Sequence, residues 1–574
     1  MMHGERINTS RRFDDDSECS EGWPRISRHQ ICRDAKLILT VSQSPAMRSV
    51  SVILVLSIAV LASLLLLIRE QKPASGTPDP ITLFCAASNR VVIEAIRADY
   101  ERDTGRTVLI QYGPSQTLLS SIEVTRTGDL FLPADDSYLT LGEQKGLIAE
   151  QLSIGFMSPV LAVRKGNPKK IQTLADAQGS DIRLVQANPD AAAIGKVTRA
   201  ALQTTGQWDA LAKSTRAFRT TVNDVANDLM VDAADVGIVY DAVLHEYKDL
   251  EAIRIPEFEA LKSRLAVGVL PHSKQPSAAL HFARYLTARD KGLKRYREHG
   301  FTAAEGDLWS DHPELSLFAG SMLRPAIEDA IQEFEQREGV RVNRVYNGCG
   351  ILVAQMKAGQ HPDAYFACDR EFMNQVPDLF PEPVDVAENE LVILVRKGNP
   401  HRIASLRDLT CDGLRVGIGH EKQCAMGWLT QNTLKEGGIQ QAVMKNVTVQ
   451  TPTGDMLVNQ LRTGSLDAAV VYLSNATGAG DELDAVRILG IPCSVAVQPL
   501  AISRETPNPQ LASRLFQALT NSVARETFEA EGFRWKAEHS NAPRAAEGTE
   551  SQVPAGSTNQ TKSEKPVGKT QEIP

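Results

Sequence analysis

The hexapeptide VRKGNP occurs twice in the chain, at residues 163–168 and again at residues 395–400. Further upstream, the dipeptide LF at 83–84 recurs at 317–318. Matching positions lie 234 residues apart early in each copy and 232 residues apart later. A period of this length corresponds to a whole domain and not to one turn of a solenoid. The sequence therefore predicts a tandem duplication.

Within the first copy, short apolar segments alternate with amphipathic helical patterns. Residues 81–86 are apolar, and Val92, Ile96 and Tyr100 then recur at helical spacing until Gly105, which stops the helix. This alternation predicts α/β architecture with a mainly parallel sheet. In such sheets ligands bind where strands end and helices begin, so the strand-to-helix turns are the first place to look for a site.

Length and composition exclude several classes of protein. A chain of 574 residues is too long for one hydrophobic core, and 42% hydrophobic with 23% charged residues is ordinary for a soluble multidomain protein. The formal net charge of -8 provides no basic face, so we expect no nucleic-acid partner. Eight cysteines are too few for a disulfide scaffold, although Cys411 and Cys424 could form a disulfide in an oxidising compartment.

The N-terminal region contains one strongly apolar run. Residues 50–68, VSVILVLSIAVLASLLLLI, carry no charge, and a helix of this length spans roughly 28 Å, close to the ~30 Å core of a bilayer. We expect an uncleaved signal anchor that makes the protein a single-pass protein of the cytoplasmic membrane, with its domains in the periplasm or outside the cell. A cleaved signal peptide is the alternative.

These patterns divide the chain into six segments. The two ends are polar and of low complexity, which is typical of disorder. The segments are a polar, disordered stretch at 1–49, a transmembrane anchor at 50–68, a linker at 69–80, a first domain at 81–308, a second domain at 309–538 and a disordered tail at 539–574.

Two serines follow the first two predicted strands of the first copy. Ser88 and Ser115 each stand where a helix is expected to begin. A single serine in such a place is most simply a helix N-cap. Two of them beside helix N-termini, which offer unpaired N–H groups and a partial positive charge, predict a cage of hydrogen-bond donors for an anion.

These turns belong to a pattern found in a known family. Together with YGPS at 112–115, D-x-F-x-x-A-D at 129–135 and GIVY at 237–240, the sequence resembles the periplasmic molybdate-binding proteins of ABC transporters over roughly residues 80–538. The resemblance implies two tandem type II periplasmic-binding domains, each with two α/β lobes that close on a tetrahedral oxyanion. It also implies an ABC permease and an ATPase as partners, and neither a cofactor nor catalytic residues.

The resemblance also assigns ligand-binding positions. In the first copy, three of them are hydroxyl groups, which belong to Ser88, Ser115 and Tyr240. The other two are backbone N–H groups, one of Val222 and one of Ile194 or Ala193. In the second copy the corresponding positions read Ser321, which is shifted by one residue, Cys349, Met426, Gly454 and Tyr472. Because a thiol is a weaker donor than a hydroxyl, we expect the second copy to bind more weakly, to bind another anion, or not to bind.

Other residues with possible chemistry receive structural interpretations. Asp129 and Asp135 flank a short predicted strand, which separates them too widely for a shared metal ion, and the same holds for Asp363 and Asp369. We expect Asp135 to order a loop at the cleft. Without a metal cluster, a phosphate-binding loop or a nucleophile triad, the sequence favours a binding protein over an enzyme.

The function expected from the sequence is capture of an oxyanion, molybdate or tungstate first, for an ABC transporter by hinge closure. The hinge is expected near residues 160–163 and 266–269, and in the second copy near 392–395 and 495–497. Two alternatives remain open: an anion-sensing or scaffolding module without a transport role, and binding of another solute such as sulfate or iron.

Overall fold

The computed structural model describes residues 79–477 and 479–537. Several predicted segments lie outside the described residues: the polar, disordered stretch at 1–49, the signal anchor at 50–68, most of the linker at 69–80 and the tail at 539–574. Within the described ranges, no helix has both the length and the apolar character that crossing a membrane requires.

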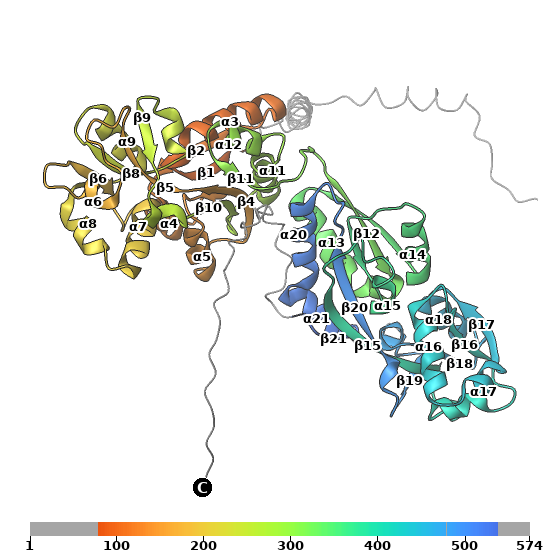
Figure 1. Ribbon diagram of the computed structural model, residues 1–574. Helices are drawn as coiled ribbons and strands as arrows, with labels where there is room; N and C mark the ends of the chain where they lie inside the picture. The colour runs from red at the N-terminus through yellow and green to blue at the C-terminus, as the bar shows by residue number, and fades with distance from the viewer. Residues whose placement is uncertain (1–78, 478, 538–574) are drawn as a thin grey trace, which may run out of the picture. The chain divides into compact units, whose positions relative to one another are not determined.

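The first lobe of the first copy is a six-stranded sheet with the order β11-β4-β10-β3-β1-β2 (Figure 1). Its strands are β1 (Ile81–Ala86), β2 (Val108–Gly113), β3 (Leu130–Leu132), β4 (Glu150–Met157), β10 (Ser263–Val269) and β11 (Thr302–Ala303). Its helices are η1 (Ala87–Asn89), α3 (Arg90–Thr104), α4 (Ser115–Thr125), α5 (Ser137–Gln144), α11 (Pro276–Leu286) and α12 (Gly292–Glu298).

The second lobe of the first copy is a five-stranded sheet with the order β7-β6-β8-β5-β9. Its strands are β5 (Pro159–Arg164), β6 (Leu184–Ala187), β7 (Thr215–Arg219), β8 (Val236–Tyr240) and β9 (Leu250–Ile253). Its helices are α6 (Leu174–Ala177), α7 (Ala193–Thr204), α8 (Trp208–Ser214), α9 (Val222–Met230), η2 (Val243–Glu246) and α10 (Pro256–Glu259).

The sheets are mixed, whereas the sequence predicted mainly parallel ones. β1 pairs in parallel with β2 and β3, but β10 runs antiparallel to β3 and β4, and β5 runs antiparallel to β8. The reason is that the chain leaves the first lobe through β4 and returns to it through β10. The returning strand enters the sheet from the side of the second lobe and therefore opposes the parallel strands.

The chain crosses between the lobes close to the predicted hinge but not at it. The first crossing is at Ser158, between β4 and β5, directly before the predicted 160–163. The second is at residues 260–262, between α10 and β10, whereas the predicted 266–269 lies inside β10. The hydrophobic runs used to locate the hinge are strands on either side of the crossings.

The helix predicted after the first strand is present as α3. Val92, Ile96 and Tyr100 are buried, as their helical spacing requires. Gly105 follows the last helical residue with φ of 71°, a left-handed conformation that glycine adopts at little cost and that ends a helix. The turn that contains Ser88 lies between the carboxyl end of β1 and the start of α3.

The second copy repeats this architecture with its two sheets joined. β15 (Val384–Arg396) pairs with β20 and then with β18, so one strand runs through both lobes in a ten-stranded sheet. The chain passes between lobes inside β15, at residues 390–391, and between β19 and β20, at residues 488–494. These crossings lie next to the predicted 392–395 and 495–497.

The other elements of the second copy follow the same order as in the first. Its strands are β12 (Glu314–Gly320), β13 (Arg341–Asn347), β14 (Ala364–Phe366), β16 (Val416–Gly419), β17 (Val447–Thr451), β18 (Ala468–Tyr472), β19 (Leu483–Arg487), β20 (Val495–Ile502) and β21 (Arg534–Trp535). Its helices are η3 (Ser321–Leu323), α13 (Arg324–Glu338), α14 (Cys349–Lys357), α15 (Arg370–Met373), η4 (Leu406–Thr410), α16 (Ala425–Glu436), α17 (Gln440–Met444), α18 (Gly454–Arg462), α19 (Leu473–Thr477), η5 (Pro492–Ser494), α20 (Pro509–Thr520) and α21 (Ser522–Ala530).

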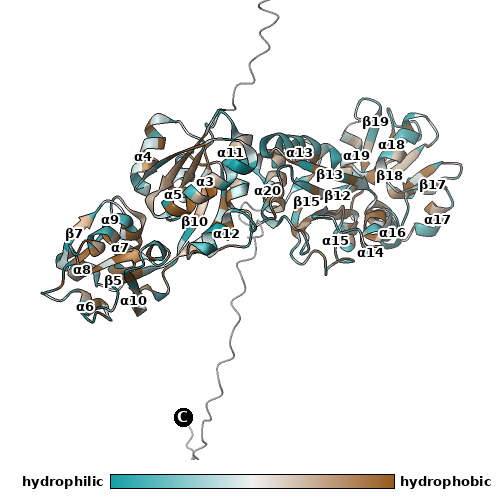
Figure 2. Ribbon diagram, turned by 90° about the horizontal axis from the view of Figure 1, so that it is seen from above, coloured by the Kyte–Doolittle hydropathy of each residue, from teal (hydrophilic) through white to brown (hydrophobic). Residues whose placement is uncertain are grey.

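Each copy has its own hydrophobic core, with strands that are buried on both faces. The strands of the central sheets are largely brown in the hydropathy colouring of Figure 2, and the helices over them carry hydrophilic faces. β1, β8 and β18 are buried almost end to end, as strands covered by helices on both faces should be.

A buried group of charges joins the two copies. Glu338, at the end of α13, accepts hydrogen bonds from Arg514 of α20 at 2.7 Å and from Arg284 of α11 at 3.2 Å. All three side chains are at least nine-tenths buried. Because removal of one partner would leave a buried charge uncompensated, this trio holds the first copy against the second.

Candidate functional site

A small cavity lies between the two lobes of the first copy. Its volume is about 20 Å³, more than the ~10–15 Å³ that a single water requires, so it suits a species of few atoms. No lining residue carries a charge. The lining consists of Ala86, Ala87, Ser88, Gly113, Pro114, Ser115, Ala134, Ala192, Ala193, Ile194, Thr221, Val222 and Tyr240.

Four helical segments begin at this cavity. η1 and α4 follow β1 and β2 in the first lobe, while α7 and α9 follow β6 and β7 in the second. The first N–H groups of a helix have no intrahelical acceptor, and the helix N-terminus carries about half a positive charge. Four such ends around one small space produce a positive potential without any cationic side chain.

Backbone donors are available in the second lobe. α7 begins at Ala193 and has no side-chain cap, while α9 begins at Val222 and its side-chain cap reaches only its third amide. Within the described part of the chain, the N–H groups of Ala193, Ile194 and Val222 have no hydrogen-bond acceptor. Thr221 caps α9 by accepting from the N–H of Asp224 at 3.2 Å, and its own hydroxyl donates to the Asp224 carboxylate at 2.8 Å.

Gly195 allows the α7 N-terminus to approach the cavity. A Cβ at this position would lie 2.4 Å from the carbonyl oxygen of Ala187, the last residue of β6. Any side chain would therefore push the first turn of α7 away from the end of the strand.

The two serines contribute hydroxyl groups in different ways. Ser115 is buried, and its Oγ accepts a hydrogen bond from the backbone N–H of Ala134 at 3.1 Å. Its hydroxyl hydrogen is therefore left for another acceptor. Ser88 is partly exposed, and its Oγ accepts from Asn89 Nδ2 at 3.4 Å, which also leaves the hydroxyl hydrogen to donate.

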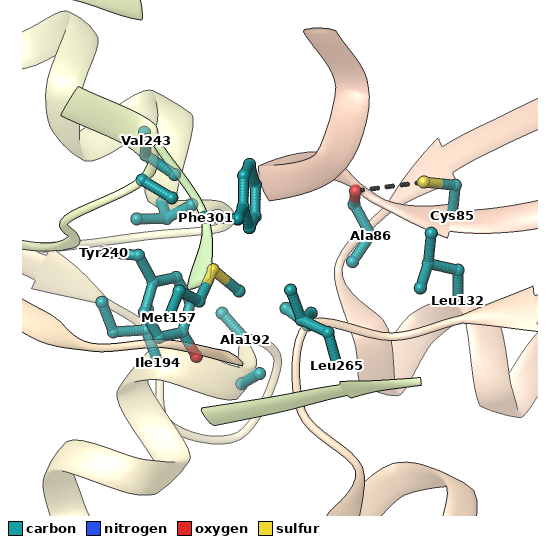
Figure 3. Close-up of a cluster of buried hydrophobic side chains, with 14 of the residues drawn as sticks. Cys85, Ala86, Leu132, Met157, Ala192, Ile194, Tyr240, Val243, Leu265 and Phe301 are labelled. Atoms are coloured by element: carbon teal, nitrogen blue, oxygen red, sulfur yellow. Dashed lines mark hydrogen bonds between the residues drawn. The ribbon is translucent and has the colours of Figure 1, made fainter. Parts of the chain in front are cut away.

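Tyr240 closes the site from the second lobe. Its hydroxyl lies 2.9 Å from Ser263 Oγ, and either group can be the donor. Burial raises the pKa of Tyr240 well above its usual value, so the phenol stays protonated at neutral pH. In Figure 3, Tyr240, Ile194 and Ala192 come from the second lobe and face Ala86, at the end of β1.

The cleft of the first copy is closed in this structure. The N–H of Gln116, in the first turn of α4, donates to the carbonyl of Ala191 in the second lobe at 3.3 Å. Lys196 of α7 donates to Ser137 Oγ in the first lobe at 3.0 Å. These two contacts bridge the lobes beside the cavity.

All six positions predicted for the first copy line this cavity, namely Ser88, Ser115, Ala193, Ile194, Val222 and Tyr240. Of the seven other lining residues, four belong to the same two strand-to-helix turns as Ser88 and Ser115, and sequence reasoning missed the remaining three, Ala134, Ala192 and Thr221. The alanines have no polar side chain that could have drawn attention. Thr221 precedes Val222 and could have been found from its capping-box spacing to Asp224.

The two aspartates of the first copy that flank β3 have structural partners. Asp129 accepts from the backbone N–H of Thr82 at 2.8 Å and from Gln275 Nε2 at 3.2 Å, which ties β1 to the start of α11. Asp135 accepts from the N–H of Ser137 at 3.1 Å and so orders the turn before α5. Across residues 79–477 and 479–537, no cluster of three His, Cys, Asp or Glu side chains is placed to hold a metal ion.

The second copy places different side chains at the same points of its fold. Cys349 begins α14 as Ser115 begins α4, and its Sγ accepts from the N–H of Cys368 at 3.1 Å, as Ser115 Oγ accepts from that of Ala134. Ser321 begins η3, so Met322 occupies the place of Ser88. Met426 follows the start of α16, where Ile194 follows that of α7.

Two further changes alter the polar groups of the second cleft. Tyr472 keeps the position of Tyr240, but its buried hydroxyl has no hydrogen-bond partner within the described ranges. In the register of β20 with β15, Ala496 stands where Ser263 stands in the first copy. Gly454 begins α18, and a Cβ there would lie 2.4 Å from Asn475 Oδ1. The side chain of Asn475 thus fills space that Val222 occupies in the first copy.

Comparisons with known proteins agree with this architecture. The family model of bacterial extracellular solute-binding proteins matches residues 81–302 and again residues 315–534. The molybdate-binding protein ModA of Mycobacterium tuberculosis is 28% identical over 223 residues, which cover 38% of this chain and 84% of that protein. ModA of Escherichia coli is 25% identical over 228 residues, which cover 36% of this chain and 87% of that protein.

Solved structures with similarity include two anion-binding proteins. The periplasmic molybdate-binding protein of Azotobacter vinelandii aligns with a TM-score of 0.35 and 17% identity, covering 39% of this chain and all of that one. The sulfate-binding protein SubI of Mycobacterium tuberculosis aligns with a TM-score of 0.35 and 18% identity, covering 39% of this chain and 87% of that one. On the strength of the two family-model matches, which span most of its length, the chain belongs to the bacterial extracellular solute-binding proteins and carries their domain twice in tandem.

Proposed function

We propose that the first copy captures a fully ionised tetrahedral oxyanion, molybdate or tungstate, in the cavity between its lobes. The observation that carries this proposal is the convergence of four helical N-termini and three hydroxyl groups on a small space whose lining contains no charged side chain. Helix N-termini are favourable sites for anions. The ModA relatives, which are named for molybdate binding, support the choice of anion.

The number of donors is sufficient for a useful affinity. Ser88, Ser115 and Tyr240 offer hydroxyl groups, while Ile194 and Val222 offer backbone N–H groups. A hydrogen bond to a charged group contributes about 1.5–3 kcal/mol. Five of them in a closed cleft reach the order of the ~8 kcal/mol that corresponds to micromolar binding.

The character of the lining favours oxyanions without a proton. A protonated anion such as hydrogen phosphate must donate its own hydrogen to an acceptor. Carboxylates are the strongest side-chain acceptors, and none lines the cavity. The site therefore favours molybdate, tungstate or sulfate over phosphate at neutral pH.

Binding and closure are linked through the two crossings at Ser158 and at residues 260–262. The donors come from both lobes, so a complete cage exists only when the lobes meet. An anion stabilises the closed form by the difference between its affinities for the closed and the open form.

The cellular role follows from the family by extension. We infer an extracytoplasmic protein, tethered by the apolar segment at 50–68, that delivers its anion to an ABC permease and ATPase. A sensory or scaffolding role without transport would use the same cleft. Anion uptake after deletion of the gene separates the two roles, because uptake falls only if the protein serves transport.

A binding panel tests the proposed anion directly. The full chain is titrated calorimetrically with molybdate, tungstate, sulfate, phosphate and ferric citrate. We expect the first two to bind at micromolar concentration or below, and phosphate to bind at least tenfold more weakly. The control variant Ser120→Ala changes an exposed serine of α4 outside the cavity and should leave all affinities unchanged. Binding of ferric citrate alone would exclude the oxyanion proposal.

A further inference from the structure

The cleft of the second copy is built around cysteine side chains. Cys349, Cys368 and Cys424 are all buried, and they stand at the positions of Ser115, Ala134 and Ala192 in the first copy. Those three positions line the anion cavity of the first copy. Three positions around one cleft are therefore cysteine in the second copy and not in the first.

Two of these thiols touch. Cys349 Sγ lies 2.8 Å from Cys368 Sγ, within an ångström of the ~2.05 Å of a disulfide bond. Both belong to the first lobe of the second copy, Cys349 at the start of α14 and Cys368 directly after β14. The fold itself does not require sulfur at either place, because the first copy forms the same turns with serine and alanine.

The neighbouring strand provides space for the pair. Gly320 ends β12, where Ala86 ends β1. A Cβ on Gly320 would lie 1.9 Å from Cys368 Sγ and 3.1 Å from Cys349 Sγ. The alanine of the first copy could not be kept beside this pair, so the change to glycine accompanies the two cysteines.

We propose that Cys349 and Cys368 are a redox-active pair that forms a disulfide inside the second cleft. The inference does not depend on which solute the first copy binds. Oxidation breaks two S–H bonds and forms one S–S bond, and the two electrons and two protons pass to a disulfide compound that becomes two thiols. Proteins outside the cytoplasm meet such oxidants, and the family of this chain is extracellular.

The disulfide changes what the second cleft offers to a ligand. In the reduced state the S–H of Cys349 donates to Cys368 Sγ, so the pair leaves one S–H donor, that of Cys368, near the point where the first copy holds the hydroxyl of Ser115. In the oxidised state it holds none. Because both cysteines lie in one lobe, the bond leaves the crossings at 390–391 and 488–494 free to move. The redox state thus sets the ligand chemistry of the second cleft without locking it.

The third cysteine faces the pair from the other lobe. Cys424 precedes α16, and burial raises its pKa to about 12. The contact with Cys349 raises the pKa of Cys368 well above its usual value. Thiol–disulfide exchange requires a thiolate, so these groups react slowly while the cleft is closed. The backbone contact of Gly350 N–H with the carbonyl of Gln423, at 3.1 Å, holds the cleft in that state.

Disulfide mapping of the full chain tests the proposal. The native protein is equilibrated with a mixture of reduced and oxidised glutathione, denatured in the presence of an alkylating agent, digested and analysed by mass spectrometry. We expect a peptide pair linked through Cys349 and Cys368, lighter by two hydrogen atoms than the sum of its reduced parts, and lost on addition of dithiothreitol.

Matched variants define the specificity of the result. Cys349→Ser copies the residue of the first copy, so it should fold, remove the linked peptide and leave Cys368 open to alkylation. Cys411→Ser changes an exposed cysteine and should leave the link intact. Recovery of Cys349 and Cys368 as alkylated thiols under the most oxidising mixture would overturn the proposal. A dominant link from either one to Cys424 would overturn the assignment of the pair.

Discussion

Replacing Ser115 with alanine separates two roles of one hydroxyl group. Its oxygen accepts the N–H of Ala134 at 3.1 Å, and its hydrogen is available to the cavity. Loss of one donor to a charged ligand costs about 1.5–3 kcal/mol of binding free energy. This corresponds to a Kd for molybdate that is roughly 10- to 150-fold higher.

The same change also affects stability. The N–H of Ala134 loses its acceptor in a buried turn, which costs about 1–3 kcal/mol of the free energy of unfolding. The second copy supplies the matched control, because Cys349 Sγ accepts the equivalent N–H at the same distance. Ser115→Cys should therefore retain most of the stability while it still weakens binding.

The assay combines calorimetric titration of the full chain with urea denaturation. We expect Ser115→Ala to lose both affinity and stability, and Ser115→Cys to lose mainly affinity. A Kd for molybdate that is equal in wild type and Ser115→Ala, in protein shown to be folded, would refute the reasoning and remove Ser115 from the site.

Three further predictions concern other parts of the chain. Tyr240→Phe removes a hydroxyl at the cavity and should raise the Kd for molybdate about tenfold or more, measured by calorimetry; an unchanged Kd would show that Tyr240 donates only to Ser263. Glu338→Gln removes the carboxylate that pairs with Arg284 and Arg514, and it should lower the free energy of unfolding by about 3–5 kcal/mol. Urea denaturation measures this, and a change below about 1 kcal/mol would contradict the structural role of the trio. Burial raises the pKa of Asp369 to about 6, above its value of ~3.9 in an unfolded chain. The contribution of this carboxyl group to stability is therefore fully present below pH ~4 and is lost as the pH rises through 6. Asp369→Asn should abolish this part of the pH dependence of urea unfolding, and identical profiles for the two proteins would refute the prediction.

The sequence was sufficient for the duplication, for the α/β class of each copy and for the principal turns. The duplication and the α/β fold are confirmed by the paired matches to one family model. Helix α3 could be predicted because Val92, Ile96 and Tyr100 follow the helical period and Gly105 ends it. Such local signals are fixed by neighbours within one or two turns of the chain.

Features that depend on distant residues could not be predicted in this way. The antiparallel entry of β10 depends on how the chain returns from the second lobe. Cys368 meets Cys349 because β14 pairs with β12, and nothing in their spacing of 19 residues shows this. The sequence suggested instead that Cys411 and Cys424 could pair; in the structure Cys411 is exposed and Cys424 is buried, and neither has a disulfide partner among residues 79–477 and 479–537.

The buried trio of charges that links the two copies could also not be predicted from the sequence. Arg284, Glu338 and Arg514 are separated by at least 54 residues and look like ordinary surface charges of three amphipathic helices. Only the packing of α11, α13 and α20 shows that they are buried together.

The position of the anion is the central claim, and a crystal of the protein grown with tungstate measures it most directly. Tungsten scatters anomalously, so its site can be located independently of the protein model. We predict one strong anomalous peak per chain in the first copy, within hydrogen-bonding reach of Ser88 Oγ, Ser115 Oγ and the start of α7. A peak elsewhere, or an empty first cleft in crystals grown at saturating tungstate, would contradict the account.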